Sequence, residues 1–228
     1  MTTKKKWIHL LRGSALCLAA CLHLSASMLP PDTLWFNGSA NGADDAENTA
    51  GSSVEFSEFN VTGSEWDINS VWSDDEVFSG GPATVTSMGW EIYSGMNATP
   101  TLVASGTGTP TYTATGLTPF GSTEYMFEID GLNVFLAPGT YWLGVYSASP
   151  FVGMYIDTTA GANAVGTPPG NGITYQGLPA GPFSGGGVSA NYSEGVAGLS
   201  GVPEPSPAIS LGTGLLLLAA SRLRAKKG

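Results

Sequence analysis

The interior of this 228-residue sequence lacks cationic side chains, histidine and cysteine. Eight Lys and Arg residues, two His and two Cys occur in the chain, but none lies between Met28 and Ser221. This absence excludes a histidine-based triad, a thiol nucleophile and a His/Cys zinc site from the region. It also excludes disulfides, a Schiff-base lysine and the cationic clamps that hold phosphate groups.

Acidic residues are distributed in the opposite way. All eighteen Asp and Glu residues lie between Met28 and Ser221, so the net charge of −10 for the whole chain understates how anionic this region is. Such a surface repels polyanions, which excludes nucleic acid as a partner. Because no ion pair can form within the region, its carboxyl groups must be hydrated, hydrogen-bonded or bound to external cations.

Residues 1–27 have the organisation of a secretory signal peptide, which is expected to be helical. A basic start precedes an apolar run over 13–24, and Ser25 and Ser27 supply small residues for cleavage after Ser27 by signal peptidase. The alternative is a lipoprotein signal, in which the sequence Leu18-Ala-Ala-Cys21 makes Cys21 the lipidated residue. The basic residues of this segment are Lys4, Lys5, Lys6 and Arg12.

The other four cations end the chain, in a tail over residues 200–228. Val202-Pro-Glu-Pro205 should be extended, because its two prolines fix φ and remove two backbone donors. The apolar span 207–221 predicts a short hydrophobic helix near the lower length limit for crossing a membrane. The basic residues after it should stay on the cytoplasmic side. They are Arg222, Arg224, Lys226 and Lys227.

This tail resembles the PEP-CTERM sorting signal of exopolysaccharide-producing bacteria. The resemblance rests on the motif Val202, Pro203, Glu204 and Pro205, on the short apolar span and on the basic end. It implies that an exosortase, a membrane protease-transpeptidase, recognises and processes the tail. The protein would then be exported, held in the membrane by its C-terminal segment, and after processing located at the cell surface or in the extracellular matrix.

The region between the two termini has the pattern of β-strands. Met88, Trp90 and Ile92 alternate, as do Tyr141, Leu143 and Val145, and Gly- and Pro-rich turns separate such segments. We therefore predict an all-β fold, an antiparallel, jelly-roll-like β-sandwich over residues 53–199. Residues 28–52 are interpreted as a flexible lead-in, in which 34–36 could form a first strand, and 195–201 as a linker.

Three kinds of site remain chemically open. Trp142 and Tyr146 lie on the strand face opposite Tyr141, Leu143 and Val145, and could stack on glycans. A Ca²⁺ site is a further hypothesis, because hard cations prefer oxygen ligands; its candidates are Asp44, Asp45, Asp74 and Asp75. Paired carboxylates could hydrolyse glycosides. The candidates for that chemistry are Asp74, Asp75, Glu76, Glu91, Glu124, Glu128 and Asp130.

The sequence favours a non-enzymatic surface or matrix protein without a catalytic residue. Its expected partners are the exosortase, signal peptidase, the membrane before processing, and extracellular polysaccharide. The alternatives are a carbohydrate-binding module of the exopolysaccharide layer and a carboxylate-based glycosidase.

Overall fold

The computed structural model describes residues 29–150, 152–167, 174–188 and 190–201. The expected signal peptide with Cys21, Ser25 and Ser27, the expected sorting motif 202–205, the apolar span 207–221 and the basic end lie outside the described residues. Almost all regular structure in the described part is β-strand, with two short 3₁₀ turns at Pro82–Thr84 and Pro119–Gly121. The prediction of an all-β fold is therefore confirmed.

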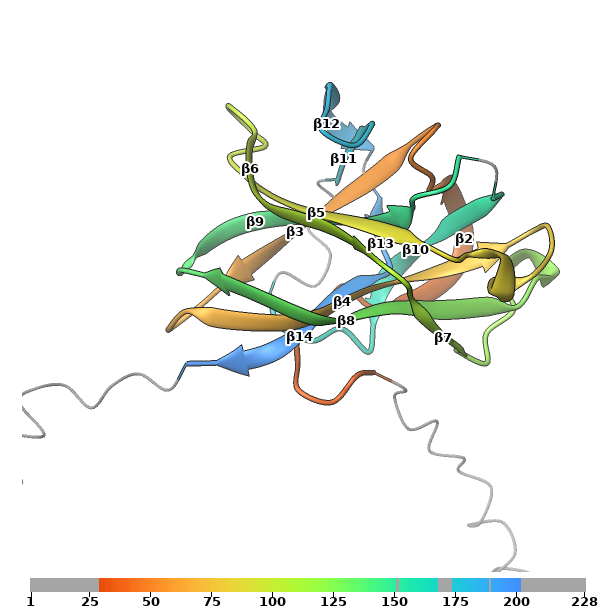
Figure 1. Cartoon of the computed structure of the whole chain (residues 1–228), viewed down its shortest axis with the longest axis horizontal. Helices are drawn as coiled ribbons and strands as arrows, with labels where there is room; N and C mark the ends of the chain where they lie inside the picture. Colours follow the sequence, from red (N-terminus) through yellow and green to blue (C-terminus); the bar gives the residue numbers. More distant parts are fainter. Residues whose placement is uncertain (1–28, 151, 168–173, 189, 202–228) are drawn as a thin grey trace, which may run out of the picture.

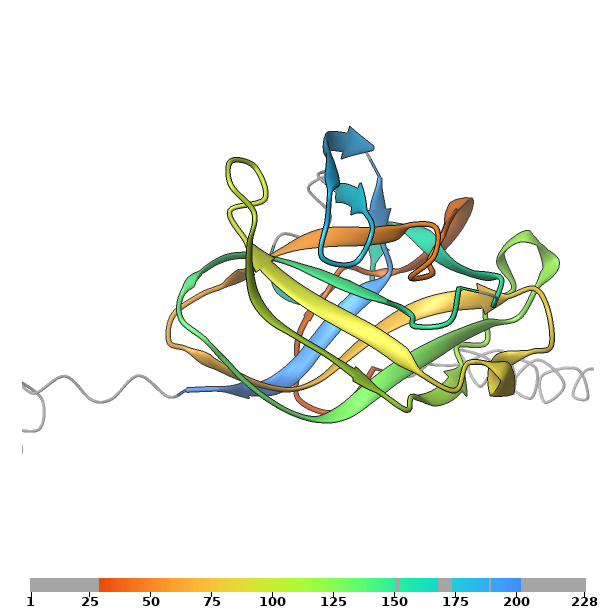
Figure 2. The same cartoon turned by 45° about the horizontal axis from the view of Figure 1, so that its top comes forward.

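Two antiparallel sheets make up the fold (Figures 1 and 2). Sheet A has the order β1-β14-β4-β10-β13, with β2 on β10, β8 on β4 and β7 on β8. Its strands are β1 (Thr33–Phe36), β2 (Ser39–Glu47), β4 (Trp66–Val77), β7 (Thr111–Ala114), β8 (Glu124–Leu136), β10 (Met154–Ala162), β13 (Asn191–Tyr192) and β14 (Glu194–Ser200).

Sheet B has the order β12-β11-β3-β9-β5-β6. Its strands are β3 (Val54–Val61), β5 (Met88–Ser94), β6 (Thr101–Gly108), β9 (Gly139–Ser147), β11 (Thr174–Gly177) and β12 (Phe183–Val188). The hairpin of β11 and β12 stands above β3 in both views (Figures 1 and 2).

The main core lies between the two sheets. Ile68, Phe127 and Val196 enter it from sheet A, while Ile92 and Leu143 enter it from sheet B, and all five are almost fully buried. Period-two alternation in β5 and β9 therefore identified the inward side chains correctly. Burial of these apolar surfaces is what holds the sheets together.

Two segments that the sequence indicated to be flexible are strands. Part of the expected lead-in forms β1 and β2, which pair with β14 and β10. The expected linker forms β14, which lies between β1 and β4. Trp72 lies over Gly195 of the glycine-rich β14, where a larger residue would have no space. Only the first-strand expectation for residues 34–36 is confirmed.

Two strands, β3 and β8, change along their length without ending. Val54 and Phe56 face away from the main core while Phe59 and Val61 face into it, so β3 changes its apolar face within one continuous strand. At Asp130-Gly131 the pairing of β8 is irregular, because Asp130 pairs with Ser70 whereas Val134 already pairs with Ile68. Gly131 adopts a φ of 77°, which relieves the steric cost of this geometry.

The close approach of Trp72 and Gly195 gives a direct test of the packing of β14. A Cβ atom at position 195 would overlap Cζ2 of Trp72, so the substitution Gly195→Ala should displace the indole ring. We expect the free energy of unfolding to fall by about 1–3 kcal/mol, measured by urea denaturation. The control Gly153→Ala meets its nearest atom only at 4.0 Å, and an equal loss in both variants would contradict this packing.

Candidate functional site

A cleft of about 410 Å³ lies on the outer face of sheet A, the face turned away from sheet B. The segment before β1, the start of β2, the end of β10, β7 and the turn that follows it form its walls. Asp74 and Glu124, both nearly inaccessible, lie in its lining. The remaining lining residues are Leu29, Phe36, Ser39, Ala40, Thr113, Thr115, Gly116, Leu117, Met126, Ala162 and Asn163.

A β-bulge in β4 turns Asp74 toward this cleft. The register between β4 and β8 shifts between Ile68 and Ser70, so that Ile68 and Val71 both face the main core. From that point the odd-numbered residues of β4 face inward, and Trp72 and Asp74 face outward. A one-residue change in strand phase reverses every later side chain, which is why this bulge decides where Asp74 lies.

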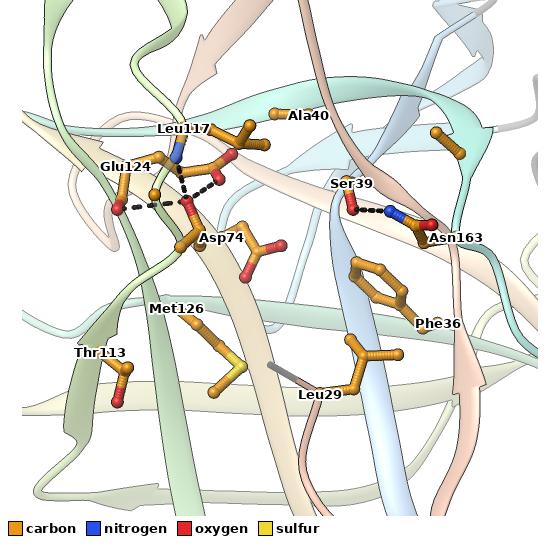
Figure 3. A pocket seen from close by; sticks show the side chains of 13 residues that line it. Leu29, Phe36, Ser39, Ala40, Asp74, Thr113, Leu117, Glu124, Met126 and Asn163 are labelled. Atoms are coloured by element: carbon orange, nitrogen blue, oxygen red, sulfur yellow. Dashed lines mark hydrogen bonds between the residues drawn. The ribbon is translucent and has the colours of Figure 1, made fainter. Parts of the chain in front are cut away.

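The carboxyl groups of Asp74 and Glu124 influence each other. Burial raises the pKa of Asp74 well above its ordinary value, and the nearby charge of Glu124 raises it further. Ser193 Oγ donates a hydrogen bond to Asp74 Oδ2 at 2.6 Å, and Thr115 Oγ1 donates one to Glu124 Oε2. Figure 3 shows the Asp74 carboxyl group directed into the space bordered by Met126, Leu29 and Phe36.

Glu124 also lies beside Asp157 of β10. Apart from their contact with each other, both oxygens of the fully buried Asp157 and Oε1 of Glu124 accept no hydrogen bond from a described residue. The two carboxyl groups can hydrogen-bond to each other only when one of them holds a proton. Burial and the charge of Glu124 together raise the pKa of Asp157, so the pair favours a shared proton.

A second set of carboxyl groups lies between the sheets. Asp75 accepts hydrogen bonds from Asn48 Nδ2 at 2.9 Å and from Ser73 Oγ, yet burial raises its pKa to about 7. Burial also raises the pKa of Glu55 to about 7, although Gln176 Nε2 donates to its Oε1 at 2.8 Å. The pKa of Glu194 is raised for the same reason.

The structure brings together only some of the carboxylates that the sequence indicated for glycoside hydrolysis. Asp74 and Glu124 share the cleft, and Glu128 interacts with Asp130 at the irregularity of β8. Glu91 lies apart on sheet B, where Tyr146 Oη donates a hydrogen bond to it at 3.3 Å. Asp75 points into the space between the sheets, opposite to Asp74 and Glu76.

The four Ca²⁺ candidates do not form a site. Asp44 and Asp45 belong to β2, whereas Asp74 and Asp75 point to opposite faces of β4 because neighbouring strand residues alternate. Within the described ranges, no group of three or more acidic residues has a geometry that could hold a metal ion.

The prediction that Trp142 and Tyr146 present rings for glycan stacking is wrong. They do face away from the main core, but only 2% of Trp142 and 7% of Tyr146 is exposed. They belong to a second apolar cluster on the outer face of sheet B, where Tyr175 packs edge-on against Trp142 with ring centroids 6.1 Å apart. Periodicity gave the correct face but could not show that β11 and β12 cover it.

Sequence reasoning did not identify Asp157 as a neighbour of the cleft carboxyl groups, nor Glu55 and Glu194 as members of the set between the sheets. Each lies in a strand distant along the chain from its partners, so no local spacing connects them. One signal was available in the sequence. Acidic residues occur within apolar strands of a region that has no cations, which indicates that buried carboxyl groups would have to lie near one another or near neutral donors.

No family model matches the chain, and no curated protein shows significant similarity to it. In the part of the chain that the structure describes, no helix is long and apolar enough to cross a membrane.

The raised carboxyl pKa values predict a protein that is more stable in mild acid than in mild alkali. The folded state binds more protons than the unfolded state at any pH between the ordinary carboxyl range and the raised values. Its free energy of unfolding should therefore be greatest below the ordinary carboxyl range and fall as the pH rises through about 7, the pKa of Asp75 and Glu55. Urea denaturation at about pH 5 and about pH 8 measures this difference.

Asp157→Asn should make the pH dependence shallower, because the amide remains uncharged at both pH values and can donate to Glu124. The exposed Glu65→Gln is the matched control and should leave the slope unchanged. A wild-type protein that gains stability toward pH 8 would show that these carboxyl groups ionise in the folded state at little cost.

Proposed function

We propose that this chain is an exported, non-enzymatic surface or matrix protein whose C-terminal tail is processed by an exosortase. The observation that carries the proposal is the order of Val202-Pro-Glu-Pro205, an uncharged span and a basic end. The apolar span retains the tail in the membrane during export, and the cations after it stay on the cytoplasmic side. The Pro-Glu-Pro element then lies where a membrane-embedded enzyme can reach it.

The distribution of charge supports this proposal. All cations belong to the two segments that direct export, and everything between them is anionic or neutral. Processing after Pro205 and removal of the signal peptide would therefore leave a body without a single cation. The last strand, β14, ends at Ser200, so only Gly201 separates it from the motif.

The chemistry of the described residues is consistent with a non-enzymatic body. Sites that cleave sugars normally surround their two carboxyl groups with partners that include Arg, His or Lys, and the body has none of these. A role in the exopolysaccharide layer would therefore be structural or would involve binding, with the folded body as the unit that is delivered.

Replacing the acidic residue of the motif should block processing. In a host that contains an exosortase, Glu204→Ala should accumulate at its unprocessed mass, at least tenfold above wild type, and remain in the membrane fraction. Intact-protein mass spectrometry of the membrane and surface fractions measures both effects. The matched control is Ser206→Ala, which leaves the four motif residues intact.

Deleting the exosortase gene should reproduce the Glu204→Ala result in the wild-type chain. Normal processing in the deletion strain would overturn the proposal, as would a Glu204→Ala chain that reaches the surface at the wild-type mass.

A further inference from the structure

The cleft on sheet A has the size and lining of a site for a small organic ligand. Its volume of about 410 Å³ is within the usual range for such sites. Phe36, Met126 and Leu117 provide apolar walls, and Ser39, Thr113 and Asn163 provide hydroxyl and amide groups. Figure 3 shows these two kinds of group surrounding Asp74, and Asn163 donates to Ser39 Oγ at 3.2 Å.

The charge of the cleft restricts what it can bind. Asp74 and Glu124 both belong to the lining. Their described side-chain partners are the hydroxyl groups of Ser193 and Thr115 and the carboxyl group of Asp157 beside Glu124, and none of these carries a positive charge. No Lys, Arg or His in the body can neutralise them. An anionic ligand would be repelled, and a neutral ligand would leave any carboxylate charge uncompensated in a site of low dielectric.

A metal ion is a poor match for these residues, because no three acidic groups of the described chain converge on one point. An ammonium group does not require such convergence, since each of its three N–H donors needs only one acceptor. Charge-assisted hydrogen bonds of this kind are also stronger than neutral ones.

The geometry points to a site in this cleft for a small organic cation with a primary ammonium group, placed between the carboxyl groups of Asp74 and Glu124. The carbon body of the ligand lies against Phe36, Leu117 and Met126. Two sources provide this chemistry, an amino sugar with a free amine and an aliphatic amine. Only the amino sugar would also use Ser39, Thr113 and Asn163, as partners for its hydroxyl groups. This inference does not depend on how the tail is processed.

Calorimetric titration of the purified, exported chain tests the inference with four probes. Glucosamine and 1,4-diaminobutane carry the ammonium group, whereas N-acetylglucosamine and glucose do not. We expect the acetylated and the neutral sugar to bind at least tenfold more weakly than glucosamine, because they lose the charge-assisted hydrogen bonds. Tighter binding of glucosamine than of diaminobutane would identify the amino sugar as the source, and the reverse order would identify an aliphatic amine.

Binding should also displace a proton from the carboxyl groups, because the ligand supplies the positive charge that the proton supplied before. The measured enthalpy should therefore change with the ionisation enthalpy of the buffer. Asp74→Asn and Glu124→Gln should each weaken glucosamine binding at least tenfold. Glu128→Gln is the matched control, since Glu128 is a partly buried carboxylate of the same sheet that does not line the cleft.

Equal affinities of the wild-type protein for glucosamine and N-acetylglucosamine would overturn the inference. This test does not depend on whether any variant folds. The absence of binding by both amines at millimolar concentration would do the same. A third contradicting result is Ca²⁺ binding that displaces the amine and is lost in Asp74→Asn, since it would identify a metal site instead.

Discussion

The folded body buries carboxyl groups in a region that contains no cationic side chain, and this constraint shapes much of the structure. An ionised carboxylate without a partner is costly in the interior, so each group needs a neutral donor, a proton or an external cation. Asn48 and Ser73 are the neutral donors for Asp75, whereas the groups that influence Asp157 are other carboxyl groups, Glu124 foremost. Because no cation pairs with these groups, the free energy of unfolding depends on pH. For the same reason, the carboxyl groups of the cleft could accept hydrogen bonds from a cationic ligand.

Where these carboxyl groups lie depends on strand phase. The bulge after Ile68 lets β4 contribute Ile68 and Val71 to one core while directing Asp74 to the opposite face. Without it, the two halves of β4 could not both bury their apolar residues against sheet B. The bulge therefore serves the packing of the core, and it also places a carboxyl group in the cleft.

Sequence reasoning predicted the β-architecture because period-two alternation is a local property of each strand. It failed at β2 and β14, where small and polar residues gave no such pattern and the strands form by pairing with their neighbours. It failed at Trp142 for a related reason. Alternation indicates which face a ring occupies, but a later segment of the chain decides whether that face is covered.

The amino-acid sequence alone determined the inventory of the protein: an anionic body, cations confined to the two ends, the chemistries that this excludes, and a tail with the features of a sorting signal. Only the tertiary structure decided which carboxyl groups meet. Asp74, Glu124 and Asp157 come from three strands, and their proximity results from long-range pairing and from one bulge. The composition can be read directly from the sequence. A cleft and a proton shared between two carboxyl groups depend instead on contacts between residues that lie far apart along the chain.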